Sequence, residues 1–371
     1  MLPYFVMVAV PAYLALFLYL YRRRFQNVSP SDYEFLQKKS YRIIIDTFFI
    51  IWLLLLLFRA ESVGVDLNTY KHHFNVFADM DWMNVFKNVF DRSLEPIYYL
   101  ICKIVSLFTS NFQWVMVICA LIAVIPIWKL YREEGQHGFL VMVLFINVAP
   151  FVMYFSGLRQ SMAMAFVLPC YHYCKDKKLW KFLLMVFLAY FFHKSALILA
   201  LLYPVYHLRL KKQIYILYLL PVAGLIYIFK QPIFLFLAYF LSNDYTENLA
   251  VKATGAYAVL LLLAVFLVYC FLMVDQEKLD EDTAGLRNIL VLCVFLQAFS
   301  GVHTLAMRMN YYFLLFVPLL IDRVLRIGNE KYSFLMKASK ICIVCFFTVY
   351  YFYYAYTDSD ILQVYPYISI F

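Results

Sequence analysis

A small set of polar and ionisable residues interrupts long apolar stretches of the chain. The clearest case is Arg159, which stands beside Gln160 in the segment SGLRQS (156–161). Charged side chains are costly within a membrane, so each one is a functional candidate by default. The set consists of Arg59, Asp66, Tyr70, Glu95, Arg159, Gln160, His193, Lys194, His303, Arg308 and Tyr311.

These residue types indicate chemistry on an anionic ligand. Arginine presents a planar fork of donors that matches phosphate oxygens, and carboxylates and histidines can transfer protons. Structural interpretations compete with this one: Arg159 could extend toward lipid headgroups, His193 could cap a helix, and Asp66 with Tyr70 could lie in a solvated turn. The set as a whole favours a lipid-linked phosphate substrate that undergoes transfer on the extracytoplasmic side.

The elements that carry these residues are predicted to be transmembrane helices. Of 371 residues, 65% are hydrophobic and only 15% are charged, which is far from the composition of a soluble domain. Apolar runs of about 15 to 20 residues fit helices that cross a hydrocarbon core of roughly 30 Å. We expect an all-α polytopic membrane protein, with 1–371 as a single transmembrane domain and residues 3–21 as a first span instead of a cleaved signal peptide.

Basic clusters indicate which loops face the cytoplasm. They lie at 22–42, 129–132, 175–181, 209–212 and 323–340. The sequence between two cytoplasmic clusters must cross the membrane an even number of times, so it forms a hairpin whose tip faces the other side. This reasoning places Arg159, His193 and Arg308 at extracytoplasmic tips. The net charge of +9 fits loops that face anionic lipid, and no nucleic acid partner is expected.

The remaining outward segment is an extracytoplasmic loop at about 59–111. Within it, Trp82, Val85, Phe86, Val89 and Phe90 have the spacing of an amphipathic helix at the membrane interface. The apolar segment 95–108 is short and is predicted to be re-entrant or membrane-parallel, because counting it as a span would place 175–181 outside. About twelve spans remain, with both termini outside. The acidic segment 275–287 is expected to be a solvated loop.

Five segments carry a family resemblance. In order they are RAESVGVDLNTY (59–70), EPIYYL (95–100), GLRQSMA (157–163), FHKSAL (192–197) and RMNYYF (308–313). Together they resemble the EpsG-like group of Wzy-type bacterial polysaccharide polymerases, which assemble O-antigen, capsule or exopolysaccharide. The resemblance implies a GT-C-like glycosyltransferase of the bacterial cytoplasmic (inner) membrane whose active site faces the periplasm or exterior.

The resemblance also implies the substrates. Donor and acceptor would both be undecaprenyl-pyrophosphate-linked oligosaccharides, and the growing chain would pass to the next lipid-linked repeat unit. Membrane lipid and a chain-length regulator protein are the further partners to expect, and no cofactor is required.

Residue roles follow from this chemistry. Arg159 and Arg308, helped by Arg59, would stabilise the pyrophosphate leaving group, with Tyr70, Gln160 and Tyr311 as further substrate-binding residues. Asp66 or His193 would be the general base; Asp66 is favoured because GT-C enzymes commonly carry a catalytic carboxylate in the first outward loop, and Glu95 is the reserve. These candidate residues include no clustered pair of carboxylates of the DxD type, so no metal is expected.

Three other functions remain open. An O-antigen ligase uses the same donor, but ligases usually carry one large outward loop late in the chain, whereas the long loop here is early. A transporter or flippase of lipid-linked oligosaccharide would be expected to show two related halves, and none is evident. A lipid-phosphate or acyl-transfer membrane enzyme is a third possibility.

Overall fold

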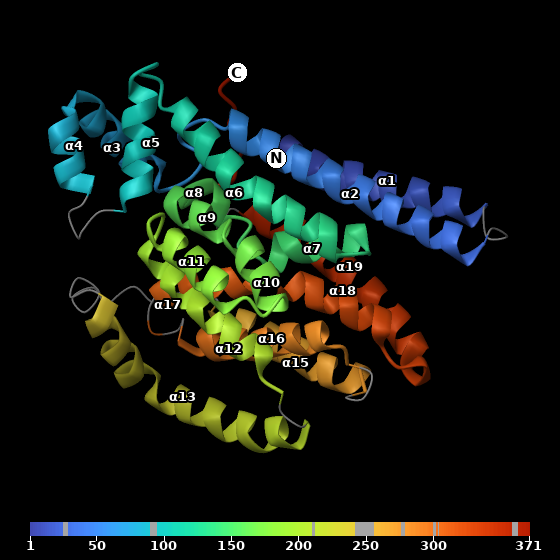
Figure 1. Cartoon of the computed structure of the whole chain (residues 1–371). Helices are drawn as coiled ribbons and strands as arrows, with labels where there is room; N and C mark the ends of the chain where they lie inside the picture. Colours follow the sequence, from blue (N-terminus) through green and yellow to red (C-terminus); the bar gives the residue numbers. More distant parts are fainter. Residues whose placement is uncertain are drawn as a thin grey trace. The chain divides into compact units, whose positions relative to one another are not determined.

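The computed structural model describes residues 1–24, 29–89, 95–209, 212–241, 256–275, 279–299, 302, 304–357 and 363–371. These parts are helical apart from connecting segments and a single bridge between Arg59 and Ser369 (Figure 1). The predicted all-α fold is therefore confirmed.

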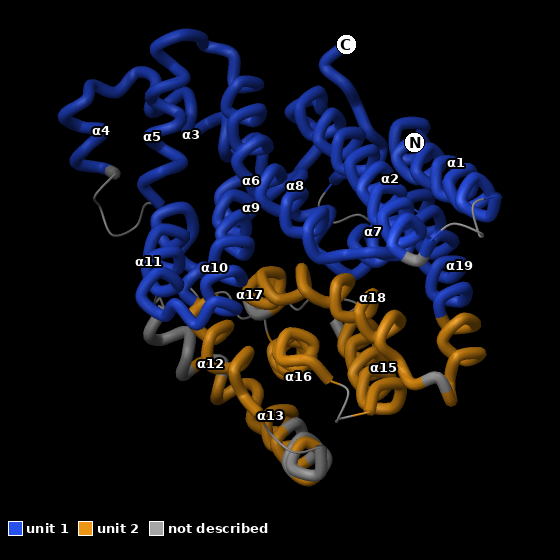
Figure 2. Tube along the Cα trace, turned by 45° about the vertical axis from the view of Figure 1, so that its right-hand side comes forward, with its two compact units in different colours: residues 1–197, 340–371 blue, residues 198–339 orange. Residues whose placement is uncertain are grey.

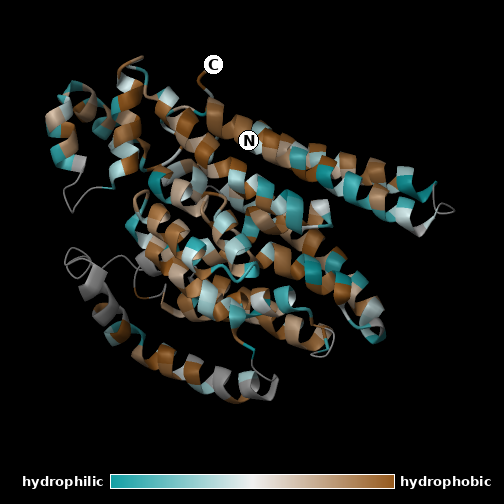
Figure 3. Cartoon of the chain, viewed as in Figure 1, coloured by the Kyte–Doolittle hydropathy of each residue, from teal (hydrophilic) through white to brown (hydrophobic). Residues whose placement is uncertain are grey.

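Within the described ranges, five helices are long and apolar enough to cross a membrane. They are α1 (Leu2–Arg23), α2 (Pro30–Phe58), α6 (Gln113–Glu134), α16 (Glu281–Phe299) and α19 (Ser333–Thr357). Figure 3 shows apolar residues along these helices, with polar residues gathered where α1 ends and α2 begins. The fold fits a polytopic membrane protein.

Other apolar helices are shorter. They include α5 (Pro96–Ser106), α7 (Gly138–Val148), α11 (Leu179–Tyr190) and α15 (Ala256–Met273). An 11-residue helix such as α5 or α7 is about 16 Å long at 1.5 Å per residue, roughly half of a 30 Å hydrocarbon core. The count of about twelve spans stays a prediction.

The chain forms two compact units (Figure 2). Unit 1 contains residues 1–197 and 340–371, and unit 2 contains residues 198–339. In unit 2, α12 (Leu202–His207), α13 (Lys212–Leu241), α15 and α17 (Thr304–Leu314) pack around α16, and α18 (Val317–Ile327) contacts both α15 and α16. The expected single transmembrane domain stays a prediction.

The core of unit 1 is an aromatic cluster between α2 and α7. Trp52, Phe48, Phe49 and Phe145 are fully buried, and the ring centroids of Trp52 and Phe145 are 5.1 Å apart. Such contacts add to the large apolar area that each ring buries. They hold α7 firmly, and the broken helices that carry the site follow α7 directly.

Two helix breaks coincide with predicted hairpin tips. After α7 the chain continues as α8 (Met153–Ser156), α9 (Leu158–Met164) and α10 (Val167–Lys175), and Arg159 lies in the first turn of α9 after the break at Gly157. His193 follows the end of α11, where its backbone N–H donates to the carbonyl oxygen of Ala189 (3.1 Å). The structure places helix breaks at these two positions, while the hairpins and the side of the membrane they face stay a prediction.

The predicted loop at 59–111 contains three helices of its own: α3 (Leu67–Asp79), α4 (Trp82–Val89) and α5. The predicted amphipathic helix is α4, with Phe90 outside the described residues; Val85 is buried and Phe86 is exposed. Pro96 begins α5, as a proline in a first turn allows. The buried ammonium of Lys103 donates to the carbonyl oxygen of Ala78 (3.0 Å), which fastens α5 to the end of α3.

The start of this loop is held by the segment 363–371. The N–H of Ala60 donates to the carbonyl oxygen of Ile368 (2.8 Å), and that of Gly64 donates to Gln363 (3.0 Å). Gly64 has φ +130°, and a Cβ there would lie 2.2 Å from the carbonyl oxygen of Phe155. Glycine is needed at this position because both the backbone conformation and the close approach exclude a side chain.

We expect Gly64→Ala to destabilise the protein by about 1–3 kcal/mol from backbone strain alone, with a further cost from the clash with Phe155. The measurement is the thermal unfolding midpoint of the detergent-solubilised protein. The control is Gly224→Ala in α13, where nothing lies within 4 Å and alanine should be neutral or stabilising by about 0.5–1 kcal/mol. Equal midpoints for the two variants would contradict this role of Gly64.

Candidate functional site

A buried carboxylate lies at the centre of the candidate site. Glu95, the N-cap residue of α5, is 6% exposed. Its Oε1 accepts a hydrogen bond from the N–H of Lys194 (3.0 Å) and contacts Nδ1 of His193. Its Oε2 lies 3.1 Å from Nη1 of Arg159. The structure therefore brings Glu95, Arg159 and His193 together from three separate segments of unit 1.

The charge on Glu95 is balanced by these neighbours. Burial raises the pKa of the carboxyl, but the hydrogen bond from His193 and the positive charge of Arg159 act against burial, and the pKa is lowered overall. A buried carboxylate is tolerated only when it is paired in this way. The pairing stabilises the fold at pH values above the ordinary carboxyl pKa. This stabilisation is lost as the pH falls through the lowered pKa of Glu95.

Arg159 is paired on one side and open on another. Its guanidinium carbon lies 5.4 Å from the ring centroid of Tyr70, within the range of a cation–π contact. Its side chain is 25% exposed, and Nε is buried with no hydrogen-bond partner. The arginine is thus held by Glu95 and Tyr70, and the exposed part of its side chain is open to a ligand.

Tyr70 supports Arg159. It is buried, and its carbonyl oxygen accepts a hydrogen bond from the hydroxyl of Tyr98 (2.9 Å). Burial raises the pKa of the Tyr70 hydroxyl, so the phenol stays neutral. Tyr70 therefore contacts the arginine through both its ring and its neutral hydroxyl.

Asp66 lies one helical turn before Tyr70, at the N-cap of α3. Its Oδ2 accepts a hydrogen bond from the hydroxyl of Ser156 (3.0 Å), and its own N–H donates to that hydroxyl oxygen (3.2 Å). The sequence does not single out Ser156, although it lies in the segment that holds Arg159. Ser156 joins the start of α3 to the helix break beside Arg159.

Arg59 lies apart from these contacts. It is fully buried, its Nη1 donates to the carbonyl oxygen of Leu56 (2.8 Å), and its guanidinium carbon is 5.7 Å from the ring centroid of Phe155. Burial lowers the pKa of Arg59 to about 10. A ligand would reach Arg59 only if the surrounding side chains moved, and its predicted help in binding pyrophosphate stays untested. Gln160 on α9 is buried too.

Two predicted site residues belong to unit 2. Arg308 and Tyr311 lie on α17 and are half-buried. Between them, the amide of Asn310 donates to the carbonyl oxygen of Cys293 and to Gln297 (3.0 Å each), which anchors α17 to α16. A contribution of Arg308 and Tyr311 to the site in unit 1 stays a prediction. His303 lies outside the described residues.

Residues 66, 70 and 73 share one face of α3, and the third of them is a histidine that the sequence analysis missed. Nδ1 of His73 lies 3.5 Å from the hydroxyl of Tyr99 on α5. The spacing i, i+4, i+7 from Asp66 was the signal that could have found it.

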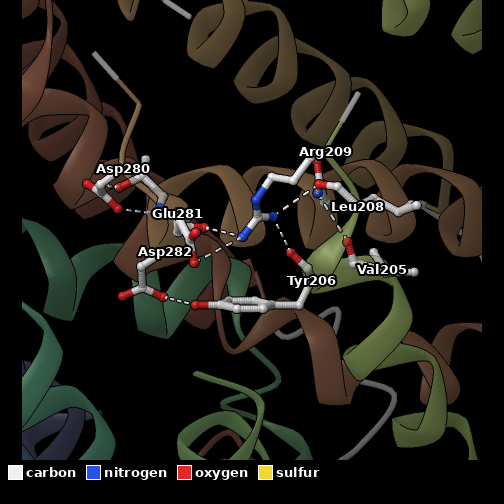
Figure 4. Close-up of polar contacts among 9 residues, drawn as sticks. Val205, Tyr206, Leu208, Arg209, Asp280, Glu281 and Asp282 are labelled. Carbon is white, nitrogen blue, oxygen red and sulfur yellow. Dashed lines mark hydrogen bonds and ion pairs between the residues drawn. The ribbon is translucent and has the colours of Figure 1, made fainter. Parts of the chain in front are cut away.

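A second polar cluster lies in unit 2 (Figure 4). Asp282 accepts a hydrogen bond from the hydroxyl of Tyr206 (2.6 Å) and pairs with Arg323, while Arg209 donates to the carbonyl oxygen of Glu281 (3.2 Å). The expectation that 275–287 is only a solvated loop is wrong, because α16 begins at Glu281 and its acidic residues fix neighbouring segments. These internal pairs account for the cluster as a structural feature.

Among the residues that the structure describes, no group of three or more histidine, cysteine, aspartate or glutamate side chains is placed to hold a metal ion. Metal independence stays a prediction.

The fold and the site define a class of protein: a multi-helical membrane protein with a buried ion pair and a histidine at its helix breaks. The EpsG family matches residues 42–369, and the chain belongs to the EpsG family, which is linked to exopolysaccharide biosynthesis. The family resemblance expected from the five sequence segments is thus confirmed. Comparisons with curated proteins and with solved structures give no match.

Proposed function

We propose that this protein is a polysaccharide repeat-unit polymerase. It transfers a growing glycan from undecaprenyl pyrophosphate onto the next lipid-linked repeat unit at the outer face of the bacterial cytoplasmic membrane. Family membership supports the pathway. The observation that carries the reaction is the convergence of Glu95, Arg159 and His193, because it joins a cation suited to phosphate with an imidazole suited to proton transfer.

In the proposed reaction, a hydroxyl oxygen of the acceptor glycan attacks the anomeric carbon of the donor. The bond from that carbon to the pyrophosphate oxygen breaks, and undecaprenyl pyrophosphate leaves with the electron pair. Arg159 stabilises the negative charge that builds on the leaving group. The proton of the acceptor hydroxyl passes to a general base.

The contacts favour His193 as that base over Asp66. Glu95 holds Nδ1 of His193, and a carboxylate at one ring nitrogen orients the ring so that Nε2 can accept a proton. The His193 side chain is 20% exposed, so substrate can reach it. Asp66 accepts a hydrogen bond from Ser156. We assign it the role of positioning α3, whose Tyr70 contacts Arg159.

The proposed location requires the predicted topology of about twelve spans with the site facing outward. Single cysteines test it in a Cys342→Ser, Cys345→Ser background, because these are the exposed native cysteines and the other six are buried. We expect Ser110→Cys to react with an impermeant thiol reagent added to intact cells and Lys181→Cys to react only after lysis. Both positions are exposed. Labelling of Lys181→Cys in intact cells would overturn the topology.

The function is tested by the lipid-linked glycans of a strain that lacks the protein. A polymerase predicts that single repeat units accumulate at the outer face and that no long polymer forms. A transporter predicts that repeat units stay at the inner face. An O-antigen ligase predicts that long lipid-linked polymer forms but is not delivered. Only the first result supports the proposal.

A further inference from the structure

The α3 and α5 helices present a shared polar surface. They pack side by side (Figure 1), and residues one turn apart on each helix face the same way. On α3 these are Asp66, Tyr70 and His73, and on α5 they are Glu95 and Tyr99. Asp66, Tyr70 and Glu95 already have roles in the proposed reaction. His73 and Tyr99 have none.

His73 is not required to fill the core. The buried side chains of α3 are Leu67, Tyr70, Phe74 and Phe77, whereas His73 is half-buried. Its ring centroid lies 5.5 Å from that of Tyr99, and Nδ1 faces the Tyr99 hydroxyl at 3.5 Å. Tyr99 itself is buried. The imidazole is therefore held at Nδ1 by a fixed neighbour, and Nε2 is the atom suited to meet a ligand.

The charge of His73 indicates which ligand it suits. Burial and the positive charge of Arg159, together with the neighbouring His72, lower the pKa of His73. The imidazole is neutral at neutral pH and adds no positive charge for a phosphate. A neutral imidazole exchanges hydrogen bonds with hydroxyl groups, which a glycan carries in abundance.

We propose that His73, held by Tyr99, binds a sugar hydroxyl of the lipid-linked glycan next to the pyrophosphate that Arg159 holds. This inference rests on the proposed function and extends its site from the phosphate to the sugar. On this proposal α3 contributes to substrate specificity: Tyr70 supports the anion-binding arginine, and His73 binds the glycan.

The test is equilibrium binding of two probes to the full-length protein in nanodiscs. One probe is undecaprenyl pyrophosphate without sugar, and the other carries a glycan repeat unit. We expect His73→Phe to raise the Kd of the glycan probe about 3- to 10-fold, the loss of one hydrogen bond, and to leave the Kd of the sugarless probe unchanged. His73→Gln keeps donor and acceptor groups and should lie between wild type and His73→Phe.

The matched control is His72→Phe, because His72 is the adjacent histidine but is exposed, and both Kd values should stay at wild type. Arg159→Ala should weaken both probes. Equal effects of His73→Phe on both probes, or none beyond those of His72→Phe, would overturn the assignment to sugar. A wild-type protein that binds neither probe would remove the proposed function and this inference together, whereas loss of the His73 effect alone leaves the polymerase standing.

Discussion

Arg159→Lys should reduce polymer formation about 10²- to 10³-fold, nearly as far as Arg159→Ala, while the protein stays folded and inserted. Loss of a positioned donor to developing charge has this size. The physical reason lies in the geometry of the guanidinium: Nη1 pairs with Glu95 while the side chain remains 25% exposed. A planar fork can serve both the carboxylate and a phosphate, whereas the compact ammonium of lysine cannot span the two.

The measurement is the rate of polymer formation by purified protein with a lipid-linked repeat unit. Arg132→Lys is the matched control, because Arg132 also pairs with a carboxylate, Asp46 (2.9 Å), but its side chain is 50% exposed. It should polymerise like wild type. An arginine that only extends to lipid headgroups makes the opposite forecast, since any cation would serve there. A near wild-type rate for Arg159→Lys would therefore contradict a pyrophosphate-binding role.

Several local features of the fold could be predicted from sequence because they depend on neighbours along the chain. Pro96 begins a helix because its fixed φ and missing N–H suit a first turn. The interruption at Gly157 and the polar residues after Tyr190 mark where apolar helices end. Apolar runs give the helical class directly, since backbone groups in lipid must be satisfied within each helix.

The tertiary partners could not be predicted in the same way. Glu95 and His193 are 98 residues apart, and Asp66 and Ser156 are 90 apart. Hydropathy indicates how deep a residue lies in a membrane, but it does not say which side of a helix meets which neighbour. Hydropathy therefore could not show that Glu95, a reserve candidate, would be the centre of the site. Nor could it show that Arg59, expected to bind substrate, would be fully buried.

Substitution of the general base should reduce the rate about as much as substitution of Arg159. We expect His193→Gln to reduce kcat about 10²- to 10⁴-fold, the usual contribution of a positioned acid–base group, with normal protein levels. Glutamine can still hydrogen-bond to Glu95, so the carboxylate remains paired with Arg159. The glutamine side chain cannot, however, take the proton from the hydroxyl of the acceptor glycan. Asp66→Asn should cost less, because the amide oxygen can still accept the hydrogen bond of Ser156.

The chain supplies a control for the histidine itself. His172 on α10 also contacts a glutamate, Glu133 (3.3 Å), in unit 1 but lies outside the site. His172→Gln should keep the wild-type kcat, which shows that loss of a histidine–glutamate pair is not harmful in general. Single-turnover rates measured with one lipid-linked repeat unit as donor and another as acceptor separate chemistry from binding. If Asp66→Asn abolishes turnover while His193→Gln retains it, the base is Asp66, and the Glu95–His193 contact serves only to hold the break after α11.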